Sequence, residues 1–167
     1  MPPRLQTDSD VATPITCILS DVDGVMTDGR IIYDSAGVET KQFHVRDGLG
    51  IKLWMQPGFQ FGILTARESP VVVRRAAELG IQHLAQGKEQ KGPAAETMMA
   101  AMGVGPQQVC YLGDDLADLP VMQQVALSVA PADAASDVQN TAHWILRSRG
   151  GDGAVRELIE RLLRAKQ

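Results

Sequence analysis

The sequence predicts an α/β fold built around one doubly wound, mostly parallel sheet. Short apolar runs of strand length alternate with helical patterns along most of the 167 residues. Alternation of this kind implies a parallel sheet with helices on both faces. One early segment, residues 30–45, departs from the pattern because two β-rich runs flank the turn sequence DSAG. This segment predicts a β-hairpin inserted into the fold.

The apolar runs define the expected strands, and the residues around them mark where helices begin and end. Residues 15–19, ITCIL, are expected to form a fully buried strand. A helix is expected over residues 68–80, with Ser69 as its N-cap and Gly80 just past its end. The other expected strands are 59–65, 81–85, 109–113, 126–130 and 143–147, and the other expected helices are 47–58, 91–103, 116–125 and 153–167.

Length and composition favour a single domain over residues 14–167, preceded by a loose, polar tail at residues 1–13. The formal net charge of −4 offers no basic surface for nucleic acid or anionic lipid. The N-terminus lacks the apolar segment of a secretory signal, and no run of about 18 apolar residues occurs. Cys17 and Cys110 fall inside expected strands and are predicted to be buried thiols. A cytoplasmic protein without a membrane partner is therefore expected.

Polar side chains follow several of the expected strands directly. Asp21 and Asp23 follow the first strand, Thr65 and then Arg67 follow the strand at 59–65, and Asp114 follows the strand at 109–113. Lys91 stands at the start of the helix after the 81–85 strand. Because ligands bind parallel sheets at the carboxyl ends of the strands, these side chains are expected to meet there.

Such a group of carboxylates requires a cation, since neighbouring negative charges raise one another's pKa. Oxygen ligands without a nearby histidine or thiolate favour a hard cation, and Mg²⁺ is the natural choice. A carboxylate beside Mg²⁺ and a phosphate can act as a nucleophile, and a second one, Asp23, could serve as acid and base. The Thr65 hydroxyl and the Lys91 ammonium would then hold the phosphoryl oxygens.

Four segments resemble the four motifs of the haloacid dehalogenase superfamily of phosphotransferases, namely SDVDGVMTDG, ILTAR, QGKEQKG and YLGDDLAD. The resemblance implies that fold, with Asp21 as the nucleophile that becomes an aspartyl-phosphate, Asp23 as acid and base, and Thr65 and Lys91 as further catalytic residues. It also implies that Mg²⁺ is held by the side chains of Asp21 and Asp114 and by the backbone carbonyl of Asp23.

Further motifs resemble one capless (C0) subgroup of that superfamily. Only the hairpin and one helix separate Asp21 from Thr65, and the segment between Thr65 and Lys91 is too short for a cap domain. The hairpin, the segment TAR, the run LGDDLADLPVM and the C-terminal GGDGAVRE are similar to phosphatases that act on 3-deoxy-D-manno-octulosonate 8-phosphate in lipopolysaccharide biosynthesis. These relatives form tetramers through their hairpins, so a homotetramer in which a neighbouring subunit closes the active site is expected.

The same resemblance implies a set of substrate contacts, which suit an anionic sugar acid because arginine pairs with carboxylate and lysine with phosphate. The set comprises Asp23, His44, Val45, Arg46, Asp47, Gly48, Lys52, Arg67, Arg75 and Lys91. Arg67 favours the eight-carbon 8-phosphate, since relatives that act on nine-carbon, sialic-acid-like 9-phosphates typically carry glutamate there. His44 and Asp152 depart from the family pattern, and Asp152 is expected to cap the last helix.

Other interpretations stay open at the level of the sequence. A nine-carbon 9-phosphate is the alternative substrate. A phospho-accepting receiver domain gathers similar residues, although its acceptor follows a middle strand, whereas Asp21 follows the first. A non-catalytic assembly domain can lose motif residues, whereas every motif position is filled here. Mg²⁺-dependent phosphate release would separate the enzyme from the last two.

Overall fold

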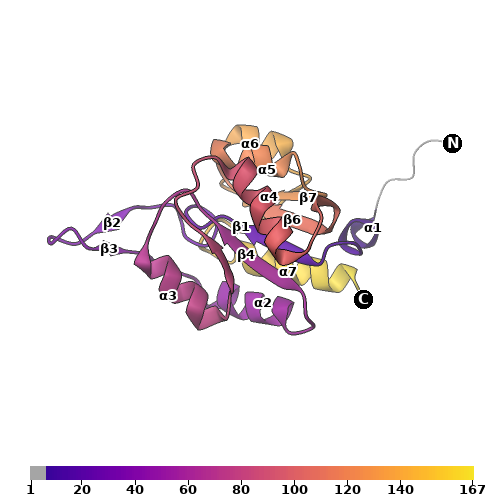
Figure 1. Cartoon of the computed structure of the whole chain (residues 1–167), viewed down its shortest axis with the longest axis horizontal. Coiled ribbons are helices and arrows are strands. Elements are labelled where there is room, and N and C mark those ends of the chain that lie inside the picture. Colours follow the sequence, from indigo (N-terminus) through magenta and orange to yellow (C-terminus); the bar gives the residue numbers. More distant parts are fainter. Residues whose placement is uncertain (1–6) are drawn as a thin grey trace.

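The computed structural model describes residues 7–167, which form a six-stranded sheet between two layers of helices (Figure 1). The strand order is β5-β4-β1-β6-β7-β8, and all neighbouring strands pair in parallel. The strands are β1 (Cys17–Ser20), β4 (Gln60–Leu64), β5 (His83–Ala85), β6 (Val109–Leu112), β7 (Leu127–Ala130) and β8 (Trp144–Ile145). The predicted doubly wound α/β fold is confirmed.

The two helical layers follow from the alternation of side chains along each strand. Ile18 and Cys110 point into one core, whereas Leu19 and Tyr111 point into the other. Helices α2 (Val45–Met55), α3 (Pro70–Leu79) and α7 (Ala154–Ala165) cover the first face. Helices α4 (Lys91–Met102), α5 (Leu119–Met122) and α6 (Ser136–Thr141) cover the second, on the upper side of the sheet in Figure 1.

The predicted hairpin is present as the antiparallel strands β2 (Ile32–Tyr33) and β3 (Glu39–Thr40). Asp34 shapes its turn, because its Oδ1 accepts hydrogen bonds from the backbone N–H groups of Ala36 and Val38 at 2.8 and 2.9 Å. Gly37 takes the positive φ of 78° that the turn requires. The hairpin projects from the body of the molecule at the left of Figure 1, and the chain after β3 leads back into α2.

The local signals of α3 are confirmed. The Ser69 hydroxyl accepts a hydrogen bond from the Val71 N–H at 3.3 Å, and Gly80 ends the helix in the left-handed conformation. The predicted helix at 116–125 is a 3₁₀ turn, Leu116–Asp118, followed by α5. Helix α6 was not predicted, and a second 3₁₀ turn covers Pro106–Gln108.

The expectation of a loose tail over residues 1–13 is wrong for part of its length. A short helix, α1 (Asp8–Ala12), begins at a capping box between Thr7 and Asp10. Arg161 of α7 donates two hydrogen bonds to the Asp8 carboxylate, at 2.7 and 2.8 Å. The first six residues of the predicted tail lie outside the described part of the chain.

Both cysteines, Cys17 and Cys110, are buried and unpaired, as the sequence predicted. Burial is also the first cause that raises the pKa of both thiols, to about 12 for Cys17. None of the helices within residues 7–167 has both the length and the apolar composition needed to cross a membrane.

Candidate active site

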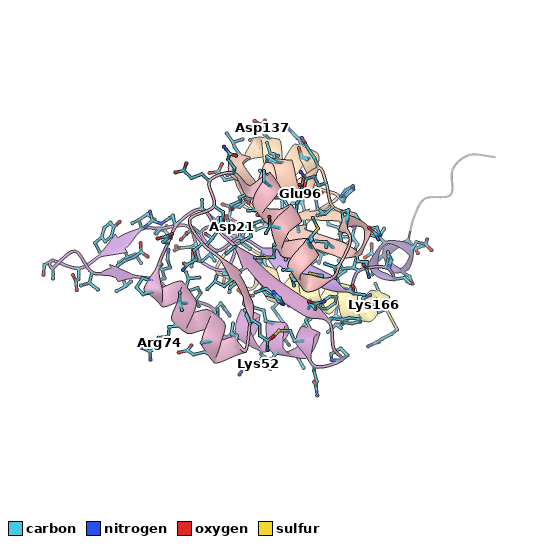
Figure 2. The ribbon with its side chains drawn as sticks, in the orientation of Figure 1. Asp21, Lys52, Arg74, Glu96, Asp137 and Lys166 are labelled. Atoms are coloured by element: carbon cyan, nitrogen blue, oxygen red, sulfur yellow. The ribbon has the colours of Figure 1, made fainter. Side chains whose placement is uncertain are left out.

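Asp21 stands directly after β1, at the carboxyl end of the central strand of the sheet. Its backbone N–H donates to the Leu112 carbonyl at 3.0 Å, which extends the pairing of β1 with β6 by one residue. Its side chain is held as well, because Oδ1 accepts from the Val22 N–H at 2.7 Å. Figure 2 shows Asp21 near the centre of the molecule, and the residue is only 7% exposed.

Residues from the far end of the sequence hold the loop after Asp21. The Gly151 N–H donates to the Val25 carbonyl at 3.0 Å. Gly150 packs so tightly on the same loop that a Cβ at this position would lie 1.8 Å from the Gly24 carbonyl oxygen. Only glycine permits this approach of two backbones, so residues 150–151 act as a clamp on the loop.

Lys91 lies buried between two carboxylates. Its Nζ is 3.0 Å from Asp21 Oδ2 and donates to Asp118 Oδ1 at 2.7 Å. Tyr111 from β6 donates its hydroxyl to the same Asp118 oxygen at 2.5 Å, and the other oxygen, Oδ2, accepts from the backbone N–H groups of Asp114 and Asp115. Asp118 is therefore saturated with donors, and its role is to position Lys91 and the loop that carries Asp114.

Asp114 faces Asp21 across the loop after β1. One oxygen from each of Asp21, Asp114 and Asp118 lies within 4.8 Å of the others, a spacing that suits a metal ion. Asp114 Oδ1 is buried and accepts no hydrogen bond. Each Asp118 oxygen already accepts from two donors, whereas each Asp21 oxygen has one partner and Asp114 Oδ1 has none, so Asp21 and Asp114 are the carboxylates with capacity for a cation.

The charges of the site repel one another without such a cation. Burial, followed by repulsion from Asp118, raises the pKa of Asp21 to about 6 despite the opposing effect of Lys91. Burial and then repulsion from Asp21 and Asp118 raise the pKa of Asp114 to about 8. Burial lowers the pKa of Lys91, but the two carboxylates beside it outweigh burial and raise that pKa. The arrangement is thus short of positive charge.

A cavity of about 290 Å³ opens over these groups. Thr65, which is 2% exposed, and Arg67 line it from the loop after β4, the strand next to β1. A larger groove of about 1170 Å³ lies between the start of α2 and α7, lined by arginine and acidic side chains. None of the converging carboxylates lines that groove, so the smaller cavity is the candidate active site.

The hairpin supplies the rim of this cavity. Lys41, just after β3, forms an ion pair with Asp23 through Oδ1. Glu39, from β3, forms an ion pair with Arg67 and has its second oxygen 3.5 Å from Lys41 Nζ. Arg67 Nε lies 3.9 Å from Asp23 Oδ2. Two acidic and two basic side chains therefore form a connected network at the mouth.

The structure separates the predicted substrate contacts into two groups. Asp23, Arg67 and Lys91 line the cavity. Most of the segment from His44 to Lys52 lies on α2 and does not line it, and neither does Arg75 on α3. In Figure 2, Lys52 lies at the outer side of α2, well away from Asp21.

Each residue of the second group has another environment within its own chain. His44 caps α2 by accepting from the Arg46 N–H at 3.1 Å. Gly48 packs against α3, where a Cβ would lie 2.4 Å from an Arg75 nitrogen, and Arg75 itself lies 3.3 Å from Glu78. Val45 is 78% exposed. Arg46 is exposed at the larger groove.

Asp47, one of the predicted substrate contacts, is 3% exposed and caps α7. Its Oδ1 accepts from the Arg156 N–H, in the first turn of α7, at 2.9 Å. Burial raises the pKa of Asp47 in spite of this hydrogen bond. The predicted cap, Asp152, does not cap the helix: the N-cap residue is Gly153, and the Asp152 side chain is 77% exposed.

Three residues of the site were missed from the sequence, namely Tyr111, Glu39 and Lys41. Tyr111 sits inside an apolar strand, where a buried hydroxyl signals a polar partner that the sequence does not name. Glu39 and Lys41 belong to a hairpin whose other charged residues face solvent, so no local pattern distinguishes them. Asp28 caps the turn into the hairpin, because its Oδ1 accepts a hydrogen bond from the Arg30 N–H at 3.0 Å.

Comparison with known proteins agrees with this geometry. A family model described as a haloacid dehalogenase-like hydrolase matches residues 78–158. The chain is 43% identical over 152 residues to the 3-deoxy-D-manno-octulosonate 8-phosphate phosphatase of Haemophilus influenzae, an alignment that covers 91% of this chain and 84% of that protein. The corresponding protein of Yersinia pestis is 44% identical over 155 residues, covering 93% and 83%.

Solved structures give the same result in three dimensions. The Yersinia pestis phosphatase matches with a TM-score of 0.92 at 44% identity, over 95% of this chain and 85% of that one. The phosphatase of Moraxella catarrhalis, in complex with a magnesium ion, a phosphate ion and a KDO molecule, matches with a TM-score of 0.93 at 37% identity, over 98% and 94%. Fold and site together define a haloacid dehalogenase-like hydrolase. Within that class, the chain belongs to the family of 3-deoxy-D-manno-octulosonate 8-phosphate phosphatases.

Proposed function

We propose that the chain is a cytoplasmic, Mg²⁺-dependent phosphatase that hydrolyses 3-deoxy-D-manno-octulosonate 8-phosphate. One observation carries the proposal: a single cavity brings together Asp21, Thr65, Lys91 and Asp114, and in it a buried oxygen of Asp114 accepts no hydrogen bond. The named activity of the relatives supplies the substrate.

A magnesium ion fits the donor set. The carboxylates of Asp21 and Asp114 would hold it, together with the backbone carbonyl of Asp23 predicted from the sequence. Oxygen donors of this kind suit Mg²⁺. When bound, the ion supplies the positive charge that the buried carboxylates and the phosphate oxygens require.

The side chains then divide the hydrolysis between them. In the first step a bond forms between an Asp21 oxygen and phosphorus, while the bond from phosphorus to the sugar oxygen breaks and that oxygen takes a proton from Asp23. In the second step Asp23 accepts a proton from water as the water oxygen attacks phosphorus and releases Asp21. Thr65 and Lys91 hold the phosphoryl oxygens throughout, since both lie beside Asp21 in the cavity.

Arg67 supports the assignment of a sugar-acid substrate. Its side chain is 40% exposed at the cavity mouth, where its positive charge would attract the carboxylate of a sugar acid. The phosphoryl end of the substrate would lie at Asp21 and the sugar acid toward Arg67. Glutamate at this position, as in the nine-carbon phosphatases, would repel such a carboxylate.

The experiment that tests the proposal is a phosphate-release assay on purified protein with Mg²⁺. It compares 3-deoxy-D-manno-octulosonate 8-phosphate with nine-carbon 9-phosphates, with EDTA and the Asp21→Asn variant as controls. We expect a preference for the eight-carbon substrate, and a loss of about 10³-fold or more in kcat for Asp21→Asn without a change in folding. Activity of that variant at the wild-type level would refute the mechanism. A preference for the 9-phosphates would favour the alternative substrate, and no turnover would favour an assembly or receiver role.

We further propose that the active form is a homotetramer in which a neighbouring subunit closes the cavity. Two observations support it. Large apolar side chains are exposed on the hairpin and at α2, including Tyr33 at 59%, Val38 at 57% and Leu49 at 52%. Contacts that the family resemblance predicts, such as Arg46, do not line the cavity of their own chain.

A mixing experiment tests the closure in trans. Asp21→Asn subunits have an inactive cavity but an intact Arg46, whereas Arg46→Ala subunits have an intact Asp21 but lack the Arg46 side chain. If Arg46 acts in the neighbour's site, mixed oligomers regain turnover above the sum of the two separate preparations. Activity equal to that sum, or a monomer by light scattering, would contradict the proposal.

A further inference from the structure

Lys41 has a buried side chain in an otherwise exposed part of the molecule. Its side chain is 1% exposed, although the neighbouring hairpin residues Thr40 and Gln42 are exposed. Lysine is almost never fully buried unless it is paired. The partner here is Asp23, whose Oδ1 accepts a hydrogen bond from Lys41 Nζ. The ion pair with Asp23 therefore accounts for the burial of the Lys41 side chain.

The contact with Lys41 fixes a side chain that has little other support. Within residues 7–167, Lys41 is the only group that donates a hydrogen bond to the Asp23 carboxylate. The nearest further cation, Arg67, lies 3.9 Å from Oδ2, beyond hydrogen-bonding distance. Asp23 also lies in the turn between β1 and the hairpin, outside any helix or strand. Orientation of the carboxylate thus depends on Lys41.

Lys41 is itself held in place. Glu39 Oε1 lies 3.5 Å from Lys41 Nζ, and the other oxygen of Glu39 pairs with Arg67. Glu39 belongs to β3 and Lys41 follows that strand directly, so the hairpin segment carries both the lysine and the carboxylate beside it. The ammonium is therefore held from two sides and anchors Oδ1 of Asp23, whereas Oδ2 accepts no hydrogen bond within the described residues.

We propose that Lys41 is a positioning residue that holds Asp23 for proton transfer to the leaving group. The inference rests on the proposed function, in which Asp23 is the general acid. A general acid must lie within about 2.6–3.2 Å of the oxygen that it protonates. By holding Oδ1, Lys41 directs Oδ2 to the sugar oxygen as its bond to phosphorus breaks, and the proton passes from Oδ2 to that oxygen.

This role makes a prediction that a merely structural role does not. A sugar alkoxide is a poor leaving group and needs the proton, whereas p-nitrophenolate leaves without one. Loss of Asp23 positioning should therefore slow hydrolysis of the sugar phosphate far more than hydrolysis of p-nitrophenyl phosphate. The ratio of the two kcat/KM values in one preparation does not depend on how much of the protein is folded.

The test compares Lys41→Met, Lys41→Arg and Asp23→Asn, with Gln42→Met as a control at the exposed neighbouring position. General acid–base catalysis contributes roughly 10²–10⁴-fold. We expect Asp23→Asn to lose about 10²-fold or more on the sugar phosphate and Lys41→Met about 10-fold or more, chiefly in kcat. Both should lose only a few-fold on p-nitrophenyl phosphate. The ratio of kcat/KM on the sugar phosphate to that on p-nitrophenyl phosphate should lie between the Lys41→Met and wild-type values in Lys41→Arg. In Gln42→Met it should equal the wild-type value.

The outcomes separate the two proposals. If Asp23→Asn lowers kcat/KM equally for the sugar phosphate and for p-nitrophenyl phosphate, Asp23 is not the general acid and the proposed function fails at that step. A second result is that Asp23→Asn lowers kcat/KM chiefly for the sugar phosphate while Lys41→Met lowers it equally for both substrates or for neither. That result overturns the role of Lys41, while the proposed function stands. Selective loss in both variants supports the role of Lys41.

Discussion

Gly24 shows how far the site depends on the absence of a side chain. A Cβ at this position would lie 1.9 Å from Asp114 Oδ2, closer than any non-bonded contact allows. Its φ of 91° is also one that other residues rarely adopt. Gly24 therefore has two separable functions: it permits the loop conformation, and it leaves room for Asp114 beside Asp21.

Comparison of Gly24→Ala with Gly58→Ala separates these functions. Gly58 has a similar φ of 98° but no atom within 4 Å of a Cβ. Both variants should lose about 1–2 kcal/mol of stability in chemical denaturation. Only Gly24→Ala should also lose activity, by about 10²-fold, because Asp114 must move. Equal activity in the two variants would show that the close contact is not functionally important.

At the scale of elements, helix α7 is fixed by partners distant in sequence. Asp47 on α2 caps its first turn, Asp8 on α1 pairs with Arg161, and Glu157 accepts backbone hydrogen bonds from Arg147 and Ser148 at 3.0 and 2.7 Å. The exposed Asp152, adjacent in sequence to the helix, contributes no cap. The C-terminal helix thus joins α1, α2 and the end of the sheet.

Asp47→Ala tests whether this residue is a structural cap. The variant should lose about 1–2 kcal/mol of unfolding free energy, because the Arg156 N–H loses its partner. Asp152→Ala, the matched control, should change stability by less than about 0.5 kcal/mol. A raised KM in Asp47→Ala without any loss of stability would instead favour the predicted contact with the sugar.

The elements also show what the sequence could and could not predict. Strands, hairpin and the capping of α3 follow from apolar runs, turn residues and Ser69, all of which are local signals. The order of polar residues after the strands was enough to bring Asp21, Thr65, Lys91 and Asp114 together. The cap of α7 by Asp47 and the ion pair of Lys41 with Asp23 are contacts between distant segments, and no local pattern encodes them.

At the scale of the whole molecule, the site opposes folding. Burial and repulsion raise the pKa of Asp21 and of Asp114, which means that their ionised forms are less stable in the folded chain than in solvent. Lys91 offsets part of this cost, and the rest of the sheet must supply the remainder. A divalent cation should therefore stabilise the entire fold.

Thermal unfolding with and without metal tests this expectation. Mg²⁺ at 100 times its Kd should stabilise the wild type by about 2.7 kcal/mol, which corresponds to a rise of about 5–10 °C in Tm for a chain of this size. Asp114→Asn should unfold at a higher temperature than the wild type in EDTA, since it removes a repelled charge, and should not respond to Mg²⁺. A Mg²⁺ shift that persists in this variant would place the ion elsewhere.

The clamp formed by residues 150–151 has a consequence for the order in which the molecule is completed. Every strand of the sheet, from Cys17 to Ile145, is translated before Gly150 and Gly151, which lock the loop that carries Asp23. The loop after β1 can therefore be locked only once all six strands have been translated, so competence for turnover follows synthesis of the sheet.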